Sequence, residues 1–212
     1  MRARFAGFQD IIEDFDQVRA IIRKPIPAIE HKILDHLDPI CRDFIAASPF
    51  VVLASRSPDG WLDLSPKGDP AGFVRVLDDH RLAIPDRPGN RRVDTFHNLL
   101  TNPELGLIFL VPGKGETLRV SGEARLVRDE ALRQSMAVKG RVPEFAIVVY
   151  VERAFMHCPK CVMRSGLWKP ERWGDASSVA DIGTAMIAHA EIDQTPEQWF
   201  ETIKKDGGLD MY

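Results

Sequence analysis

"FVVLASRSPDGWLDLS", residues 50–65, indicates the fold class of this chain. The stretch opens with an apolar run, reaches turn residues at Asp59 and Gly60, and continues as an alternating run. In the second run Trp61, Asp63 and Ser65 share one face, because successive side chains of a strand point to opposite sides. Two strands joined by a short turn form a β-hairpin, so an antiparallel sheet is expected to begin near residue 50.

Further strand signals follow at short intervals. "GFVRVLDDHRLAIP", residues 72–85, repeats the hairpin arrangement with Asp78 and Asp79 in its turn. "ELGLIFLVPG" and "ETLRVSGEARLV" are joined by the turn "PGKG", and "EFAIVVYVERAFMH", residues 144–157, is the last apolar strand. Six or seven strands with few βαβ crossovers predict an α+β protein, mainly β, in which a small antiparallel barrel is flanked by helices.

Helical periodicity dominates the chain before residue 49. "DFDQVRAIIRK", residues 14–24, carries one apolar stripe, and a second helical pattern runs from Ile29 to Leu37, followed by a short helix after Pro39. Another helix is expected in "GNRRVDTFHNLLTNP", with Asn90 as its N-cap, and a short one in "RDEALRQSMAVKG". The expected organisation is therefore an N-terminal helical extension packed on the barrel (1–48), the barrel itself (49–160), and a helical or irregular tail (161–212).

Composition and net charge argue against some classes of binding partner, namely nucleic acid and anionic membranes. The chain has 212 residues and a formal net charge of -3, so no global positive field attracts nucleic acid or an anionic membrane. No apolar run approaches the roughly 20 residues of a membrane span, and the N-terminus lacks a signal-peptide core. We expect a cytoplasmic protein whose three cysteines form no disulfide framework.

An arginine cluster lies at the start of the helix expected in "GNRRVDTFHNLLTNP". If that helix starts at Asn90, Arg91 and Arg92 fall in its first turn, where a cation is disfavoured by about 0.3 to 1 kcal/mol. Free N–H groups at a helix start, together with guanidinium groups, suit a phosphate monoester. The sequence thus predicts a phosphate site that also includes Arg87. The alternative is that these arginines point outward and pair with nearby carboxylates or solvent.

"HCPKC", residues 157–161, has the composition of a metal or redox site. It offers three ligands at most, and Cys41 is far away in the sequence, so a tetrahedral zinc site is not complete. The βαβ context typical of a redox Cys-x-x-Cys motif is missing here, and reversible oxidation of an accessible pair stays an alternative. We expect no metal site, and interpret the stretch as the end of the last strand followed by a short helix.

One segment resembles a known family. "IPDRPGNRRVDTFHNLLTNPELGLIFL", residues 84–110, has the strand, loop, helix and strand succession of FMN-binding split-barrel proteins related to pyridoxamine 5'-phosphate oxidase. Its Asn90, Arg91 and Arg92 match the triplet that grips the FMN phosphate in that family. The resemblance covers about residues 45 to 160 and implies a split barrel of the FMN-binding type. "SPKGDPAGFVRVLDD" and "RSGLW" are similar to a less characterised branch of the family.

The resemblance also implies a set of cofactor contacts. Pro85 and Asp86 correspond to positions beside the flavin ribityl chain or phosphate, and Ser65 and Lys67 to the end of a strand that lines the ring. The resemblance further implies a homodimer with FMN at the interface, in which Trp168 is either a wall of the neighbouring subunit's flavin site or an ordinary packing anchor. The expected cofactor-binding residues are Ser65, Lys67, Pro85, Asp86, Asn90, Arg91, Arg92, Thr117 and Trp168.

FMN itself carries hydride or electron chemistry, so no catalytic residue needs to be visible in the sequence. The expected function is that of an FMN-dependent oxidoreductase acting on an unknown small molecule. The chain departs from true oxidases where "GLWKPERWGDASS" replaces their Arg-rich last strand, which argues against pyridoxamine phosphate as substrate. Two alternatives remain: a non-catalytic FMN or haem carrier, and a zinc- or nucleic-acid-binding regulator using His157, Cys158 and Cys161.

Overall fold

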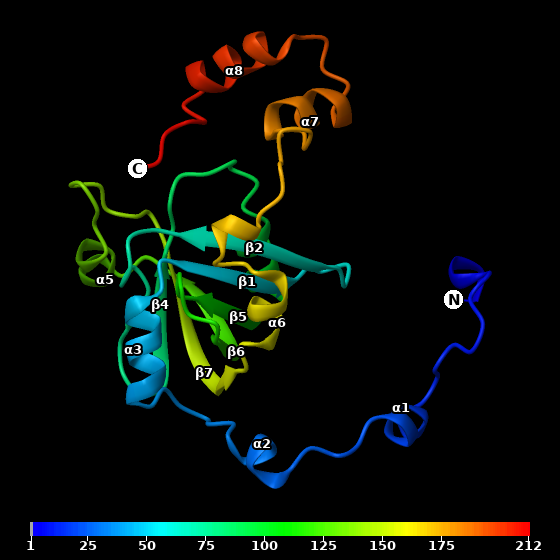
Figure 1. The fold of residues 1–212 in the computed structure, drawn as a ribbon. Coiled ribbons are helices and arrows are strands. Elements are labelled where there is room, and N and C mark those ends of the chain that lie inside the picture. The colour runs from blue at the N-terminus through cyan, green and yellow to red at the C-terminus, as the bar shows by residue number, and fades with distance from the viewer. Residues whose placement is uncertain (1) are drawn as a thin grey trace. The chain divides into compact units, whose positions relative to one another are not determined.

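The computed structural model describes residues 2–212 and divides into two compact units, which meet in the sequence between Ile33 and Leu34 (Figure 1). The first unit contains a 3-10 helix and two short α-helices: η1 (Arg2–Phe5), α1 (Phe15–Ile21) and α2 (Pro27–His31). The helical pattern expected up to Leu37 ends at His31. Leu34 instead forms an isolated antiparallel bridge with Ala154, which gives its main chain a partner in the sheet.

The second unit is built on a seven-stranded sheet whose neighbouring strands are all antiparallel, in the order β2-β1-β5-β6-β7-β4-β3. The strands are β1 (Phe50–Arg56), β2 (Leu62–Gly68), β3 (Arg75–Val76), β4 (Arg81–Pro85), β5 (Glu104–Leu110), β6 (Thr117–Val127) and β7 (Ala146–His157). Among the described residues the strand order ends at β2 and β3, so the sheet is not closed. This arrangement confirms the prediction of an α+β protein with an antiparallel split barrel.

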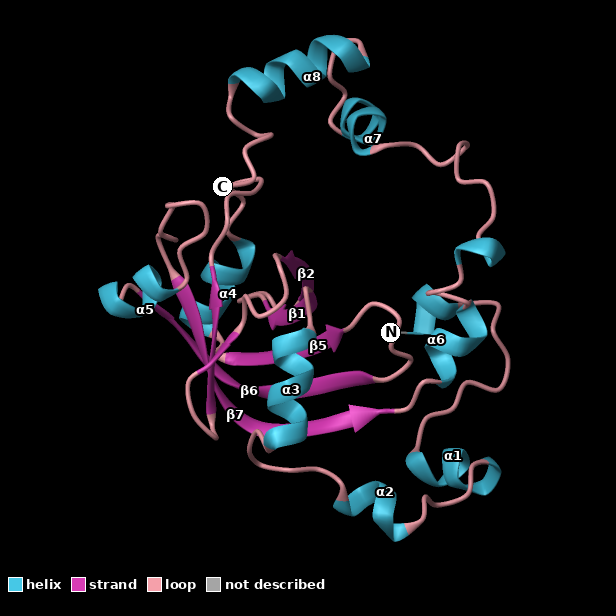
Figure 2. Ribbon diagram, turned by 60° about the vertical axis from the view of Figure 1, so that its left-hand side comes forward, coloured by secondary structure: helices cyan, strands magenta, loops and turns pink. Residues whose placement is uncertain are grey.

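The core lies on one face of the curved sheet. Strand β1 shows the alternation that causes this, because Val51 and Leu53 are fully buried while Val52 between them faces the other side. Helix α3 (Pro39–Ala47) covers the core face and lies across β6 and β7 in Figure 2. It adds Cys41 and Ile45 to the same core, so α3 belongs to the barrel unit. Burial raises the pKa of the Cys41 thiol to about 12, which keeps it protonated.

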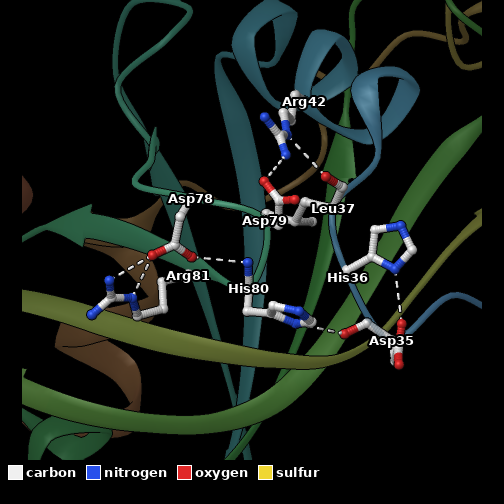
Figure 3. A network of polar contacts seen from close by, with 8 residues as sticks. All are labelled: Asp35, His36, Leu37, Arg42, Asp78, Asp79, His80 and Arg81. Carbon is white, nitrogen blue, oxygen red and sulfur yellow. Dashed lines mark hydrogen bonds and ion pairs between the residues drawn. The ribbon is translucent and has the colours of Figure 1, made fainter.

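A network of polar contacts fixes the start of α3 to the turn between β3 and β4 (Figure 3). The main-chain N–H of Leu37 donates to the carbonyl of Asp79 at 2.7 Å, and the Arg42 guanidinium pairs with the Asp79 carboxylate. Asp78 accepts from the His80 N–H at 2.9 Å and pairs with Arg81, which holds its pKa below the usual range. These contacts confirm the predicted turn at Asp78 and Asp79 and assign the network a structural role.

Helix α4 (Asp94–Thr101) begins three residues later than the sequence predicts. Val93, not Asn90, is the N-cap, and it caps with a left-handed backbone (φ 54°) and no side-chain hydrogen bond. Arg91 is left-handed too (φ 59°), and two such residues interrupt a right-handed helix. Asn90 instead accepts a hydrogen bond from the Arg92 N–H at 3.1 Å. The expected placement of the arginines in the first helical turn is therefore wrong, and they lie in a loop.

The remaining helices follow the strands. They are α5 (Glu130–Ser135), α6 (Lys160–Ser165), the 3-10 helix η2 (Pro170–Arg172), α7 (Ile182–His189) and α8 (Pro196–Lys205). Helix α6 starts directly after β7, as expected for the stretch that contains "HCPKC". Helices α7 and α8 pack against each other. Within residues 2–212, the helices are all too short or too polar to cross a membrane.

Candidate anion-binding site

A pocket of about 430 Å³ opens where the two ends of the sheet approach each other. One wall is β2, the first strand in the sheet order, and the other is the loop after β4, the sixth strand. The first residues of α4 complete the lining. The pocket brings together six of the expected cofactor contacts, namely Ser65, Lys67, Asp86, Asn90, Arg91 and Arg92.

A buried ion pair holds the two walls together. The Arg87 Nε lies 2.6 Å from the Asp69 Oδ2, and the two side chains are only 16% and 1% exposed. Asp69 directly follows β2 and Arg87 comes two residues after β4, so the pair joins the ends of both strands. Arg87 also donates to the Met136 carbonyl at 2.9 Å. Because Asp69 compensates its charge, Arg87 has a structural role, while it also lines the pocket and its predicted contact with a phosphate stays a prediction.

Lys67 and Asp86 face each other across the pocket, each partly removed from water. The Lys67 ammonium donates to the Ser65 hydroxyl at 2.7 Å. Burial lowers the pKa of Lys67, and the Asp86 charge opposes that change. Burial likewise raises the pKa of Asp86, against the effect of Lys67. Desolvation thus dominates at both groups, and an anion bound beside Lys67 would stabilise its charged form.

Arg91 and Arg92 lie at the exposed mouth of the pocket. Arg91 pairs with Asp206 (Nη1–Oδ2 2.9 Å), and the two side chains are 64% and 67% exposed. Arg92 pairs with Asp94 (Nε–Oδ2 2.7 Å), which raises the pKa of the guanidinium. These contacts match the alternative in which the arginines point outward and pair with nearby carboxylates. Exposed ion pairs are weak, so both guanidiniums are free to exchange a carboxylate for a phosphate.

The pocket wall is also held by polar contacts that the sequence patterns do not predict. The buried Asn98 of α4 donates to the Ser55 hydroxyl at 2.9 Å and to the Asp63 carboxylate at 2.6 Å. These bonds join α4 to β1 and β2. The alternation of residues 61–65 already placed Asp63 on the face of Ser65, whereas no local signal points to Asn98 or to the Asp69–Arg87 pair.

Three expected contacts lie outside this lining. Pro85 is buried and paired with Ala146 in the sheet. Thr117 is buried at the start of β6, beside Leu110 and His157, and its hydroxyl has no hydrogen-bond partner among the described residues. The Trp168 indole N–H donates to the Lys114 carbonyl at 2.7 Å. Their proposed contacts with a cofactor remain predictions.

The cysteines near the end of β7 do not form a recognisable centre. Cys158 and Cys161 are both exposed and unpaired as free thiols. In the part of the chain that the structure describes, His, Cys, Asp and Glu side chains nowhere gather in threes suitable for a metal ion. The zinc-binding alternative therefore gains no support from the geometry.

Several solved structures are similar to part of this chain. Similar solved structures include HupZ of Group A Streptococcus (19% identity, 57% of this chain and 99% of that chain, TM-score 0.47). A putative pyridoxamine 5'-phosphate oxidase from Lactobacillus delbrueckii is also similar (21% identity, 57% and 95%, TM-score 0.45). So is a pyridoxamine 5'-phosphate oxidase-related, FMN binding protein from Nostoc punctiforme (15% identity, 56% and 78%, TM-score 0.37).

At the level of sequence, no curated protein matches the chain. A family model, described as pyridoxamine 5'-phosphate oxidase, matches residues 37–158, which is more than half of the chain. The matched range contains the whole sheet and every residue that lines the pocket. The chain therefore belongs to the pyridoxamine 5'-phosphate oxidase family.

Proposed function

We propose that this protein binds FMN in the pocket between β2 and the loop after β4, with the phosphate held by Lys67, Arg91 and Arg92. The observation that carries the proposal is that Lys67 of β2 and the neighbouring Arg91 and Arg92 of the loop after β4 line one pocket. Its volume of about 430 Å³ is in the range of small-molecule sites, about 300–1,000 Å³. The partly dehydrated Lys67 adds support, because an anion offsets the cost of burying its charge.

The lining favours a flavin over haem. Haem iron is usually held by a His, Cys, Met or Tyr side chain. The residues that line the described pocket include none of these four types. The haem-carrier alternative thus lacks an axial ligand at this site, while the phosphate of FMN has several donors.

The proposed activity is that of a flavin-dependent oxidoreductase acting on a small molecule. Bound FMN would supply the hydride or electron transfer. The chain's own residues would position it: Lys67 and the two arginines bind the phosphate, and the Asp69–Arg87 pair keeps the walls at a fixed separation. Asp86, whose pKa is raised by burial, places a carboxyl group at the same pocket.

We also propose that two copies of the chain form a homodimer that encloses the flavin. Support comes from the outer face of the sheet, where a hollow of about 530 Å³ is lined by apolar residues of β1 and β5 and, from β6 and β7, by residues that include Arg119 and Arg153. Leu64 lines both this hollow and the FMN pocket, and Leu62 and Leu64 are 75% and 71% exposed. Exposed apolar patches of this kind often mark protein interfaces. Light scattering after size-exclusion chromatography measures the oligomeric state directly.

The visible spectrum of the purified protein tests the flavin assignment. We expect a yellow protein, or a colourless one that takes up FMN and quenches its fluorescence. Arg91→Ala with Arg92→Ala should weaken binding at least about 100-fold, since two charge-assisted interactions are removed. A matched control, Arg81→Ala with Arg125→Ala, removes two exposed arginines outside the pocket lining and should bind like the wild type.

Two results would overturn the assignment: wild-type FMN affinity in the Arg91/Arg92 variant, or a wild type that cannot be loaded with FMN. Turnover is tested separately, by anaerobic reduction of the loaded protein with NADH or NADPH. Bleaching of the flavin band supports an oxidoreductase, and an unchanged band supports the carrier.

A further inference from the structure

The segment that follows α8, residues 206–212, reaches the proposed FMN pocket, and we call it the C-terminal strap. At its first residue, the Asp206 Oδ2 accepts from the Arg91 Nη1 at 2.9 Å, and the Asp206 carbonyl accepts from the Arg91 Nη2. At its last residue, the Tyr212 hydroxyl donates to the Asp69 Oδ1 at 2.8 Å, and the Tyr212 carbonyl accepts from Arg141. The strap therefore contacts residues beside both walls of the pocket.

The Tyr212 end of the strap is firmly attached. Asp69 is almost completely buried, and its other oxygen binds Arg87, so the tyrosine hydroxyl completes a buried network. The hydrogen bond to Asp69 raises the pKa of Tyr212 and keeps the phenol protonated. The Lys139 ammonium lies 4.8 Å from the centre of the tyrosine ring, a further favourable contact.

The Asp206 end is attached loosely. Both partners of the Arg91–Asp206 pair are about two thirds exposed, and such pairs contribute little in water. Asp206 is also the C-cap of α8, where the helix dipole disfavours a negative charge. The helix itself thus gives no reason for an acid at this position. The interaction partner of Asp206 is Arg91, a cation of the proposed phosphate site.

We propose that the C-terminal strap is a built-in competitor of the anionic ligand: Asp206 occupies Arg91 until the phosphate of FMN displaces it. This inference rests on the proposed function, because it assigns a regulator to the same site. A tethered carboxylate competes at an effective concentration in the millimolar range, so even a weak pair lowers the apparent affinity for FMN. The Tyr212 end stays bound during the exchange and returns Asp206 to Arg91 when the ligand leaves.

The test compares two single substitutions in the strap. Asp206→Asn removes the competing charge, and Asp210→Asn removes the same charge four residues later, from a residue that forms no ion pair with Arg91 among those described. FMN is titrated into each flavin-free protein at low ionic strength. We expect Asp206→Asn to bind FMN roughly two- to fivefold tighter than the wild type, and Asp210→Asn, which breaks no ion pair with Arg91, to show a clearly smaller gain.

A double-mutant cycle locates the effect. In the Arg91→Ala background, Asp206→Asn should give no gain, since its partner is missing. If the wild type binds FMN but the two strap variants have equal affinities, the competitor role is overturned and the proposed function stands. If the gain persists without Arg91, the effect is general electrostatics and the inference is also overturned. If no form binds FMN, the proposed function fails and the inference with it.

Discussion

Arg87 and Arg91 are close in the sequence, but they differ in burial and therefore in role. Arg87 is 16% exposed and bound to Asp69, whereas Arg91 is 64% exposed and bound to a replaceable carboxylate. From the sequence alone, both arginines are predicted to bind phosphate. Their roles differ because of distant partners: Asp69, which binds Arg87, follows another strand, and Asp206 lies 115 residues away from Arg91.

The substitution Asp69→Asn tests the structural role of the Asp69–Arg87 ion pair. The substitution leaves the Arg87 charge without compensation in a nearly buried position, so we expect the free energy of unfolding to fall by about 3 kcal/mol. Urea unfolding measures the change. The control is Arg125→Ala, which breaks an exposed pair with Glu123 and should cost less than about 1 kcal/mol. Equal effects of the two substitutions would contradict the role of the buried pair.

Lys67 gives FMN binding a pH dependence with a defined sign. Burial places the pKa of the free-state lysine below its usual value of 10.5, and a bound phosphate raises it again. The favourable charge is fully present below the free-state pKa and is lost as the pH rises through the bound-state pKa. FMN affinity should therefore fall on the alkaline side, as measured by fluorescence titration. Lys67→Gln, titrated in parallel, should show only the ligand's own pH dependence; identical profiles would exclude Lys67 from the site.

Strands β6 and β7 contain a bulge that only glycine permits. Their register shifts between Ser121 and Gly122, and a Cβ built on Gly122 would lie 1.9 Å from the Tyr150 carbonyl oxygen. Gly122→Ala should lower the free energy of unfolding by at least about 2 kcal/mol, because backbone must move. In the neighbouring strand, Gly106→Ala meets only the Ala54 Cβ at 3.8 Å and should be nearly neutral. Thermal unfolding of both variants is the measurement, and equal stabilities would refute the close approach.

Secondary-structure elements that depend on neighbouring residues can be predicted from this sequence. Features that depend on residues far apart in the sequence cannot. Both predicted hairpins are present, because each depends on a turn and two adjacent runs. The predicted start of α4 is too early, because no feature of "GNRRVD" indicates that Arg91 and Val93 have left-handed backbones. For the site, strand alternation correctly grouped Asp63 with Ser65. The Asn98 and Asp69 contacts depend on which elements pack together, which periodicity does not specify.

The chain divides into two units after Ile33, and the hydrophobic core lies in the second unit. Every residue of the main core cluster lies at or after Leu37. Removal of residues 1–33 should therefore leave cooperative unfolding and FMN affinity unchanged, as measured by urea denaturation and flavin titration. A longer deletion through Ala47 also removes Leu37, Cys41 and Ile45 and should abolish cooperative unfolding. Loss of the folded state in the shorter form would show that the first unit is needed.

The position of the pocket also determines when it forms during folding. Its walls, β2 and the loop after β4, are connected within the sheet only through β1, β5, β6 and β7. The pairing that brings β4 into place joins residues as far apart as Arg81 and Tyr150, and such distant contacts are slow to form. A ligand that bridges the walls therefore recognises the completed sheet rather than an earlier intermediate. FMN should consequently slow unfolding while leaving the rate of folding nearly unchanged, so that cofactor loading prolongs the lifetime of the native state.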